Sequence, residues 1–297
     1  LERLPRGMST VQERKGPRKA PQYVLQDYGN VLFWTMQVEG GNIAQKGMTV
    51  RVDDGPGGVA EGKAWMLYDH DTMRLAAAWT GDKFVDWRGI AFDGSHGSHT
   101  SIVGEKKFVF PNVPMWANPV EGGYEDSRIL GRDNKPYGPL PGKWVKFRGL
   151  QYAGGEAVID YTVGETEIQE VPQWDGGEQS FVRVMKIGPG GKALRMRLNA
   201  GKEHVFPASK VAQIYRVVIG EGIEVRAARA GDEELFGRKP APRFQGRLVT
   251  RIARGADDGP FAVDVLHTPP PAENPWQSWM RTSGFDYFEG GKSAAVC

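Results

Sequence analysis

The chain has 297 residues, 40% of them apolar, which is enough for the core of one large β domain or two of ordinary size. Its 38 lysines and arginines nearly balance its 36 aspartates and glutamates, and the net charge of +2 provides no overall field for nucleic acid or an anionic membrane. The single cysteine, Cys297, excludes an internal disulfide framework and a cysteine-based zinc site.

Residues 1–22 are basic and are interrupted by proline. Only Glu2 and Glu13 oppose the six lysines and arginines of this segment. We interpret it as an extended basic arm, which is either a contact surface or a solvated terminus without a partner. No apolar core of the signal-peptide type follows the first residues, and no apolar run reaches the roughly 20 residues that span a bilayer. We therefore expect a chain that does not cross a membrane.

Residues 23–266 consist of short apolar stretches separated by Gly, Pro, Asn or Asp, which is typical of a sandwich or barrel. In "LRMRL" (194–198) apolar and basic residues alternate strictly, as expected of a strand with one face in a core. Gly164-Glu165 suits a type II′ hairpin loop, and the best helix candidate is only 231–238. The pattern predicts an all-β fold, an antiparallel β-sandwich with long loops and little helix, formed as one unit or as two sub-halves that meet near residues 175–180.

Two segments interrupt this pattern. The loop 110–142 is long and rich in Pro and Gly, but its aromatic side chains Trp116, Tyr124 and Tyr137 can hold it in place, so we predict an ordered loop. Residues 267–284 read as a proline-rich connector, with an extended polyproline stretch at 269–271. Residues 285–297 read as a terminal strand.

Histidine and carboxylate residues gather at three places. His70 lies between Asp69 and Asp71, and "FDGSHGSHTS" (92–101) contains Asp93, His96 and His99. These residues are candidates for a transition-metal site, or they belong to polar turns whose side chains bond the local backbone. "VDDGPGGVAEG" (52–62) places three acids around glycines, which suits Ca²⁺, but the stretch departs from the EF-hand loop D-x-[DN]-x-[DN]-G. We expect no cofactor in this chain, with Ca²⁺ or a transition metal as the alternative.

Acids and tryptophans alternate between residues 65 and 93. Asp69, Asp71 and Asp93 are candidate acid and base groups for glycoside cleavage, with indoles to stack on sugar rings. The structural interpretation is that the aspartates cap turns and the tryptophans fill the core. No G-x-S-x-G elbow supports a serine nucleophile. The candidate ligand-binding residues of a sugar site are Trp79, Trp87, Trp116, Tyr124 and Tyr137.

Four stretches carry a family resemblance: "YVLQDYGNVL" (23–32), residues 42–81, "DWRGIAFDGSHGSH" (86–99) and residues 136–172. Together they resemble an uncharacterised domain near the front of large exported bacterial proteins. In those proteins the domain is followed by a β-propeller of the sugar-dehydrogenase type and often by a c-type haem module. The resemblance is strongest over residues 23–190 and implies no catalytic residue. Residues 284–297 are similar to the first propeller strand, but the haem motif C-x-x-C-H is absent here.

We therefore expect a non-catalytic binding or assembly module of an exported, electron-transfer-associated bacterial system, in the periplasm or outside the cell. Its contact surfaces would be the arm 1–22 and the loop 110–142. Its partners would be other protein subunits or domains, such as a β-propeller or a c-type cytochrome, or a glycan. The alternatives are a carbohydrate-active hydrolase or metal-dependent enzyme in the region from Asp69 to His99, and a carbohydrate-binding module.

Overall fold

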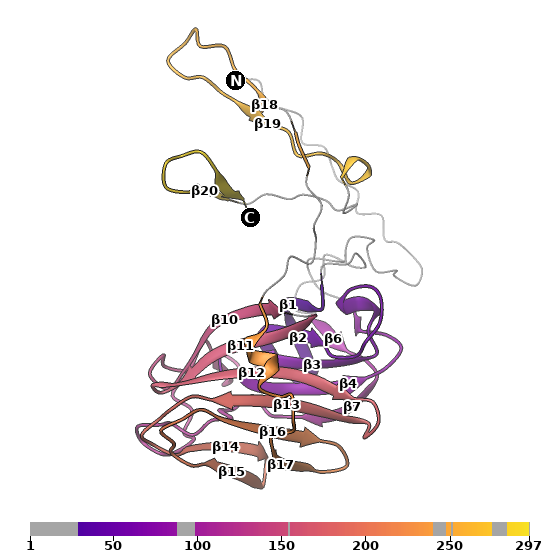
Figure 1. Cartoon of the computed structure of the whole chain (residues 1–297), viewed down its shortest axis with the longest axis vertical. Helices are drawn as coiled ribbons and strands as arrows, with labels where there is room; N and C mark the ends of the chain where they lie inside the picture. The colour runs from indigo at the N-terminus through magenta and orange to yellow at the C-terminus, as the bar shows by residue number, and fades with distance from the viewer. Residues whose placement is uncertain are drawn as a thin grey trace.

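The computed structural model describes residues 29–87, 99–153, 155–239, 248–250, 252–274 and 284–296. Two β-sheets face each other in it as the layers of a sandwich (Figure 1). The α-helix found in these described ranges, α2 (Glu234–Gly237), has only four residues. The prediction of an all-β sandwich with long loops and little helix is therefore confirmed.

The first sheet has seven strands in the order β5-β6-β1-β2-β3-β4-β7. All neighbours pair antiparallel except β1 and β6, which run parallel. Strands β1 to β4 are neighbours in both sequence and space, so the centre of the sheet is a meander. The strands are β1 (Val31–Glu39), β2 (Asn42–Arg51), β3 (Ala64–Asp69), β4 (Arg74–Thr80), β5 (Val85–Asp86), β6 (Thr100–Ile102) and β7 (Glu105–Val109).

The second sheet has six antiparallel strands in the order β10-β11-β12-β13-β16-β17. Val163 pairs with Thr166, so Gly164 and Glu165 form a two-residue loop between β11 and β12. Gly164 has a positive φ of 60° and the φ of Glu165 is not positive, which agrees with the predicted type II′ hairpin. The strands are β10 (Val145–Ala153), β11 (Glu156–Val163), β12 (Thr166–Asp175), β13 (Ser180–Ile187), β16 (Gln213–Ile219) and β17 (Ile223–Ala227).

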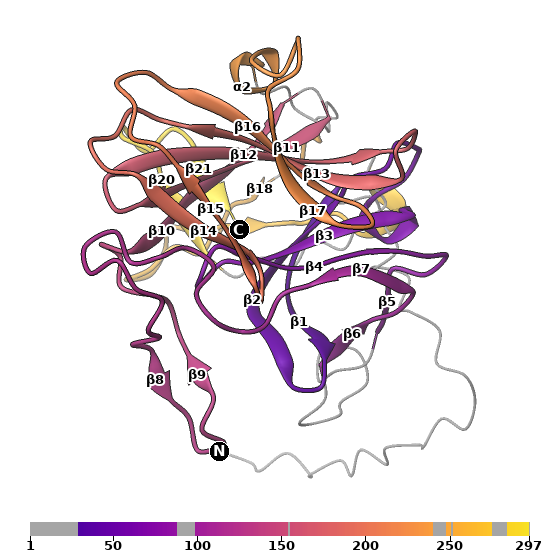
Figure 2. The same cartoon turned by 90° about the horizontal axis from the view of Figure 1, so that it is seen from below.

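Four two-stranded hairpins lie outside the two sheets. The β8–β9 hairpin projects from the sandwich (Figure 2). The hairpins are β8 (Ile129–Leu130) with β9 (Pro136–Tyr137), β14 (Leu194–Asn199) with β15 (Lys202–Phe206), β18 (Ile252–Ala253) with β19 (Val265–Leu266), and β20 (Phe285–Tyr287) with β21 (Ala294–Val296). Two short 3₁₀ turns, η2 (Val59–Glu61) and η3 (Pro271–Glu273), complete the described elements.

Apolar clusters lie on both faces of each sheet. Between the sheets, Met66 and Phe108 of the first sheet belong to one apolar cluster with Ile159 and Phe181 of the second. The outer face of the first sheet holds a second cluster, and that of the second sheet packs against α2. All six residues of β3 are buried for this reason, since successive strand residues point to opposite faces.

A charged cluster lies inside the sandwich. The Glu170 carboxylate accepts hydrogen bonds from Arg183 at 2.6 and 3.0 Å, from Tyr68 at 2.6 Å and from Tyr161 at 3.0 Å. All four side chains are buried, and burial raises the pKa of both tyrosines. The four donors satisfy a carboxylate that would otherwise be costly to remove from water.

Two of the predicted segments differ from the structure. Residues 175–180 join β12 to β13 within one sheet, and the two sheets divide instead at the 110–144 connection. The terminal segment holds the hairpin β20–β21 rather than a single strand. The arm 1–22 lies outside the described residues. Among those described, no helix has the length and apolar character needed to cross a membrane.

Candidate functional site

A cleft opens where strands β11 and β12 separate. The two strands pair from Val163 and Thr166 as far as Ile159 and Glu170, but β12 continues to Asp175 beside β13 alone. Pro172 lies in the part of β12 that has no partner on the β11 side, and proline has no N–H to donate to a neighbouring strand. The sheet therefore divides between the start of β11 and the end of β12.

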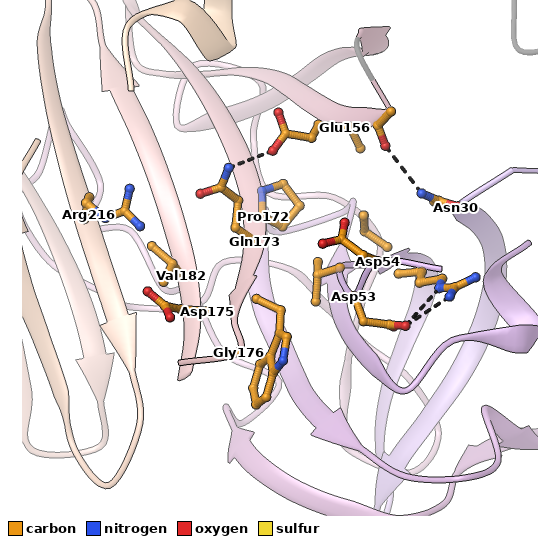
Figure 3. Close-up of a pocket in the computed structure, with 16 residues that line it drawn as sticks. Asn30, Asp53, Asp54, Glu156, Pro172, Gln173, Asp175, Gly176, Val182 and Arg216 are labelled. Atoms are coloured by element: carbon orange, nitrogen blue, oxygen red, sulfur yellow. Dashed lines mark hydrogen bonds and ion pairs between the residues drawn. The ribbon is translucent and has the colours of Figure 1, made fainter. Parts of the chain in front are cut away.

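The cleft has a volume of about 420 Å³ and is lined by residues from distant parts of the chain. This is within the usual range for small-molecule sites, about 300 to 1,000 Å³. In Figure 3, Arg216 and Asp175 lie on one side of Pro172 and Gln173, and Asp53 and Asp54 lie on the other.

Arg51 organises one wall of the cleft. Its Nη1 donates to the carbonyl oxygens of Pro56, Gly57 and Gly58 at 2.9 to 3.3 Å, and its Nε and Nη2 donate to Asp53 at 3.3 and 3.0 Å. The Arg51 side chain is 3% exposed. Three carbonyl oxygens of this loop and the Asp53 carboxylate thus surround a guanidinium group, so these oxygens already have an internal cation in place of Ca²⁺.

Two other carboxylates of the cleft are also held by the protein. Glu156 accepts from Gln173 and Arg238, both at 2.7 Å. Asp175 accepts from the backbone N–H groups of Glu178 and Gly177 and from Arg229. The Glu178 N–H, together with the Arg229 guanidinium and the Gly177 N–H, holds the pKa of Asp175 below its ordinary value.

Asp54 differs from these acids. It is exposed, and no hydrogen bond or ion pair holds it within the described part of the chain. The lining therefore contains one carboxylate that is free to accept hydrogen bonds from a ligand.

Trp174 and Arg216 supply the other unsatisfied groups. Trp174 is half-buried, its ring centroid lies 4.7 Å from that of Phe181, and its indole N–H has no partner among the described residues. Arg216 donates from Nη1 to Asp232 at 2.6 Å. Its side chain is only 7% exposed, yet its buried Nε has no partner in the described structure. Because the Arg216 Nε is buried, the unpaired donor that a ligand in the cleft can reach is the indole N–H of Trp174.

Two of the three acids predicted for catalysis, Asp69 and Asp71, have structural roles, and the third, Asp93, lies outside the described residues. Asp69 is 2% exposed and bonds Arg74 at 3.2 and 3.3 Å, and Asp71 is 6% exposed and pairs with Lys46 at 3.1 Å. Burial raises the pKa of Asp69 despite Arg74. The hydrolase hypothesis built on these two residues is corrected, because neither buried carboxylate can reach a sugar bound at the surface.

The predicted metal ligands do not converge among the described residues. His70 is half-buried with its ring edge-on to Phe147 at 4.1 Å, and burial lowers its pKa. The backbone carbonyl of His99 accepts from Ser101. Asp93 and His96 lie outside the described residues. Within the described ranges, no group of three His, Cys, Asp or Glu side chains is placed to hold a metal ion.

The predicted aromatic ligand residues differ in burial. Trp79 and Trp116 are fully buried, so the prediction that they bind a surface ligand is corrected: both are core residues. Trp87 packs edge-on against Phe84 at 5.5 Å on the covered outer face of the first sheet. Tyr124 and Tyr137 remain accessible on the 110–142 loop.

The loop 110–142 is ordered, as predicted. Trp116 forms a β-bridge with Met196, and its carbonyl oxygen accepts a hydrogen bond from the Trp144 indole N–H at 3.0 Å. Tyr124 donates to Glu203 at 2.7 Å, and the Arg197 guanidinium lies 3.9 Å from the Tyr124 ring centroid. The contacts with Met196, Glu203 and Arg197 fasten the loop to the β14–β15 hairpin.

The cleft residues were missed because they come from six separate segments of the chain. The one local signal is Pro172, since proline inside a strand pattern indicates an edge or a break in pairing. The cleft groups that lack a full set of partners are Asp54, Trp174 and Arg216.

Comparison with known proteins adds one finding. Residues 66–170 match a family model described as a domain of unknown function (DUF6797). No curated protein and no solved structure matches the chain. The matched span includes Glu156 but ends before Pro172, so it covers only part of the cleft, and a family of unknown function assigns no role to any residue.

Proposed function

We propose that this chain is a non-catalytic binding module whose cleft holds a neutral, polyhydroxylated ligand of the carbohydrate type. The observation that carries the proposal is the half-buried indole of Trp174 in a cleft whose lining also holds the free carboxylate of Asp54. An aromatic face with a few fixed polar groups is the usual composition of a small-molecule site.

The polar groups of the cleft suit hydroxyl groups. Asp54 accepts hydrogen bonds and the indole N–H of Trp174 donates one, and a sugar hydroxyl does both. Four carboxylates and two guanidinium groups line the cleft. This balance favours a neutral ligand over an anionic one.

The same geometry supports binding over cleavage. Glycoside hydrolysis normally uses two carboxyl groups, one as acid and the other as base or nucleophile. Asp53, Glu156 and Asp175 are each engaged by arginine, which leaves Asp54 as the free carboxylate among the described cleft residues.

The family resemblance supports a wider proposal. The module would act beside a sugar-oxidising propeller and a c-type haem module in an exported protein, in the periplasm or outside the cell. The β8–β9 hairpin is the surface we propose for a protein partner, because Ile129 and Leu130 are 82% and 62% exposed on it. Exposed apolar side chains on a projecting element are typical of contact sites.

The test is binding to an array of neutral and anionic glycans, followed by calorimetry with the best neutral binder. We expect Trp174→Ala to weaken binding about tenfold. Asp54→Asn should weaken it severalfold without affecting folding, because Asp54 has no hydrogen-bond or ion-pair partner to lose among the described residues. Asp258→Asn, at another exposed aspartate, is the matched control. Absence of binding to every neutral glycan, or equal affinity in the Asp54 and Asp258 variants, would contradict the proposal.

A further inference from the structure

We propose that the ligand is an extended oligosaccharide that continues from the cleft past Trp174 into a second hollow. This inference rests on the proposed function and specifies its ligand class. It begins from the observation that two separate hollows have Asp53 and Trp174 in common.

The second hollow lies at the edge of the first sheet and has a volume of about 410 Å³. Asp53 connects it to the cleft: one carboxylate oxygen accepts from Arg51, and the other accepts from the N–H groups of Lys63 and Ala64 at 2.8 and 2.9 Å. The shared rim is therefore a fixed part of the structure. Trp174 stands on the same rim and is itself held by Phe181.

The lining of the second hollow is polar and accessible. Lys63 pairs with Asp82 at 2.9 Å, and Lys107 pairs with Glu105 at 2.5 Å. Lys63 is 63% exposed and Asp82 is 97% exposed. Such surface pairs contribute little to stability, so their donors and acceptors can turn to ligand hydroxyls at small cost.

A polar hollow therefore lies on each side of the aromatic side chain of Trp174. A chain of linked sugar rings repeats hydroxyl edges and apolar ring faces, so it can meet both hollows and the indole together. A single sugar in the cleft would leave the second hollow unused. The two hollows together contain six carboxylates and four cationic side chains, which disfavours a polyanionic chain such as a polyuronide.

The test is calorimetric titration with cello-oligosaccharides from cellobiose to cellohexaose, and with matched xylo- and chito-oligosaccharide series. We expect the affinity for one series to rise about tenfold between the disaccharide and the pentasaccharide. Lys63→Ala and Lys107→Ala should remove most of this gain and leave disaccharide binding unchanged. Lys210→Ala, at an exposed lysine outside both hollows, should keep the gain.

The outcomes separate the two proposals. An affinity that does not depend on chain length, or a gain that survives both lysine variants, overturns the extended ligand while the binding function stands. Failure of every oligosaccharide to bind overturns the proposed function and this inference with it. Trp174→Ala should weaken short and long ligands alike, because the indole borders both hollows.

Discussion

Glu170 and Arg183 form a two-bond ion pair, at 2.6 and 3.0 Å, between the two sheets and out of contact with water. Replacing Glu170 by Gln keeps the shape but leaves the Arg183 charge buried without its counter-ion. We expect the free energy of unfolding to fall by about 3 to 5 kcal/mol, measured by urea denaturation.

Glu203→Gln is the matched control for this variant, because Glu203 also pairs with an arginine and a tyrosine but lies at the surface. Its loss of stability should be much smaller, since water replaces the lost partner. Equal losses in the two variants would contradict a special role for the buried cluster.

Arg51 should hold the conformation of the loop 52–62 and, through its bonds to Asp53, the shape of one wall of the cleft. Arg51→Ala removes the donor to three carbonyl groups and leaves Asp53 without its cation. We expect about 3 kcal/mol lower stability and faster cleavage of this loop in limited proteolysis. Arg254→Ala, at an exposed arginine, serves as the control. An unchanged proteolysis pattern in the Arg51 variant would show that the loop is held by other contacts.

Trp116 should matter for stability and not for ligand binding. It is fully buried, with the Phe206 ring at 5.8 Å and the Tyr161 ring at 6.3 Å. Trp116→Ala should lower the free energy of unfolding by about 3 to 5 kcal/mol, because it leaves a cavity. Trp116→Phe should lower it less and leave glycan affinity as in the unmodified chain. A weaker glycan affinity in the folded Trp116→Phe variant would show that Trp116 takes part in ligand binding.

His204 should make stability depend on pH. Burial lowers its pKa below the ordinary value of 6.5, and its ring packs edge-on against Phe206 at 4.7 Å. The unfolded chain therefore takes up the proton more readily than the folded chain. The contribution of His204 to the free energy of unfolding is fully present above pH 6.5 and is lost as the pH decreases below it. His70, whose pKa burial also lowers, adds to this loss in the same direction.

The measurement is urea denaturation at neutral pH and at mildly acidic pH. We expect His204→Gln to lose less stability on acidification than the unmodified chain does. His267→Gln, at an exposed histidine, is the control and should behave as the unmodified chain. An acid loss that is the same with and without His204 would assign the effect to other groups.

Local patterns in the sequence were enough for the strands. The alternation of Leu194, Met196 and Leu198 with arginines is found in β14, with the three apolar side chains buried. Gly164 adopts the positive φ that the two-residue loop needs. These features follow from neighbouring residues alone, because side-chain alternation and turn conformation are local properties of the backbone.

Burial of the tryptophans was decided by tertiary structure. Trp79 and Trp174 both lie in strands, yet Trp79 is covered by Phe84 and Trp174 stands at the divided end of the second sheet. Nothing within a strand tells which of its faces another layer will cover. The assignment of Trp79 and Trp116 to ligand binding failed for this reason.

The sequence by itself thus determined that the chain is an all-β sandwich, because strand periodicity and turn conformation depend on residues that are neighbours in the sequence. Only the tertiary structure decided where a ligand can be held. The cleft exists because β12 continues past Glu170 without β11, and its lining takes Asp54 and Trp174 from segments far apart in the sequence. Their convergence depends on how the sheets pack, and no spacing along the chain encodes it.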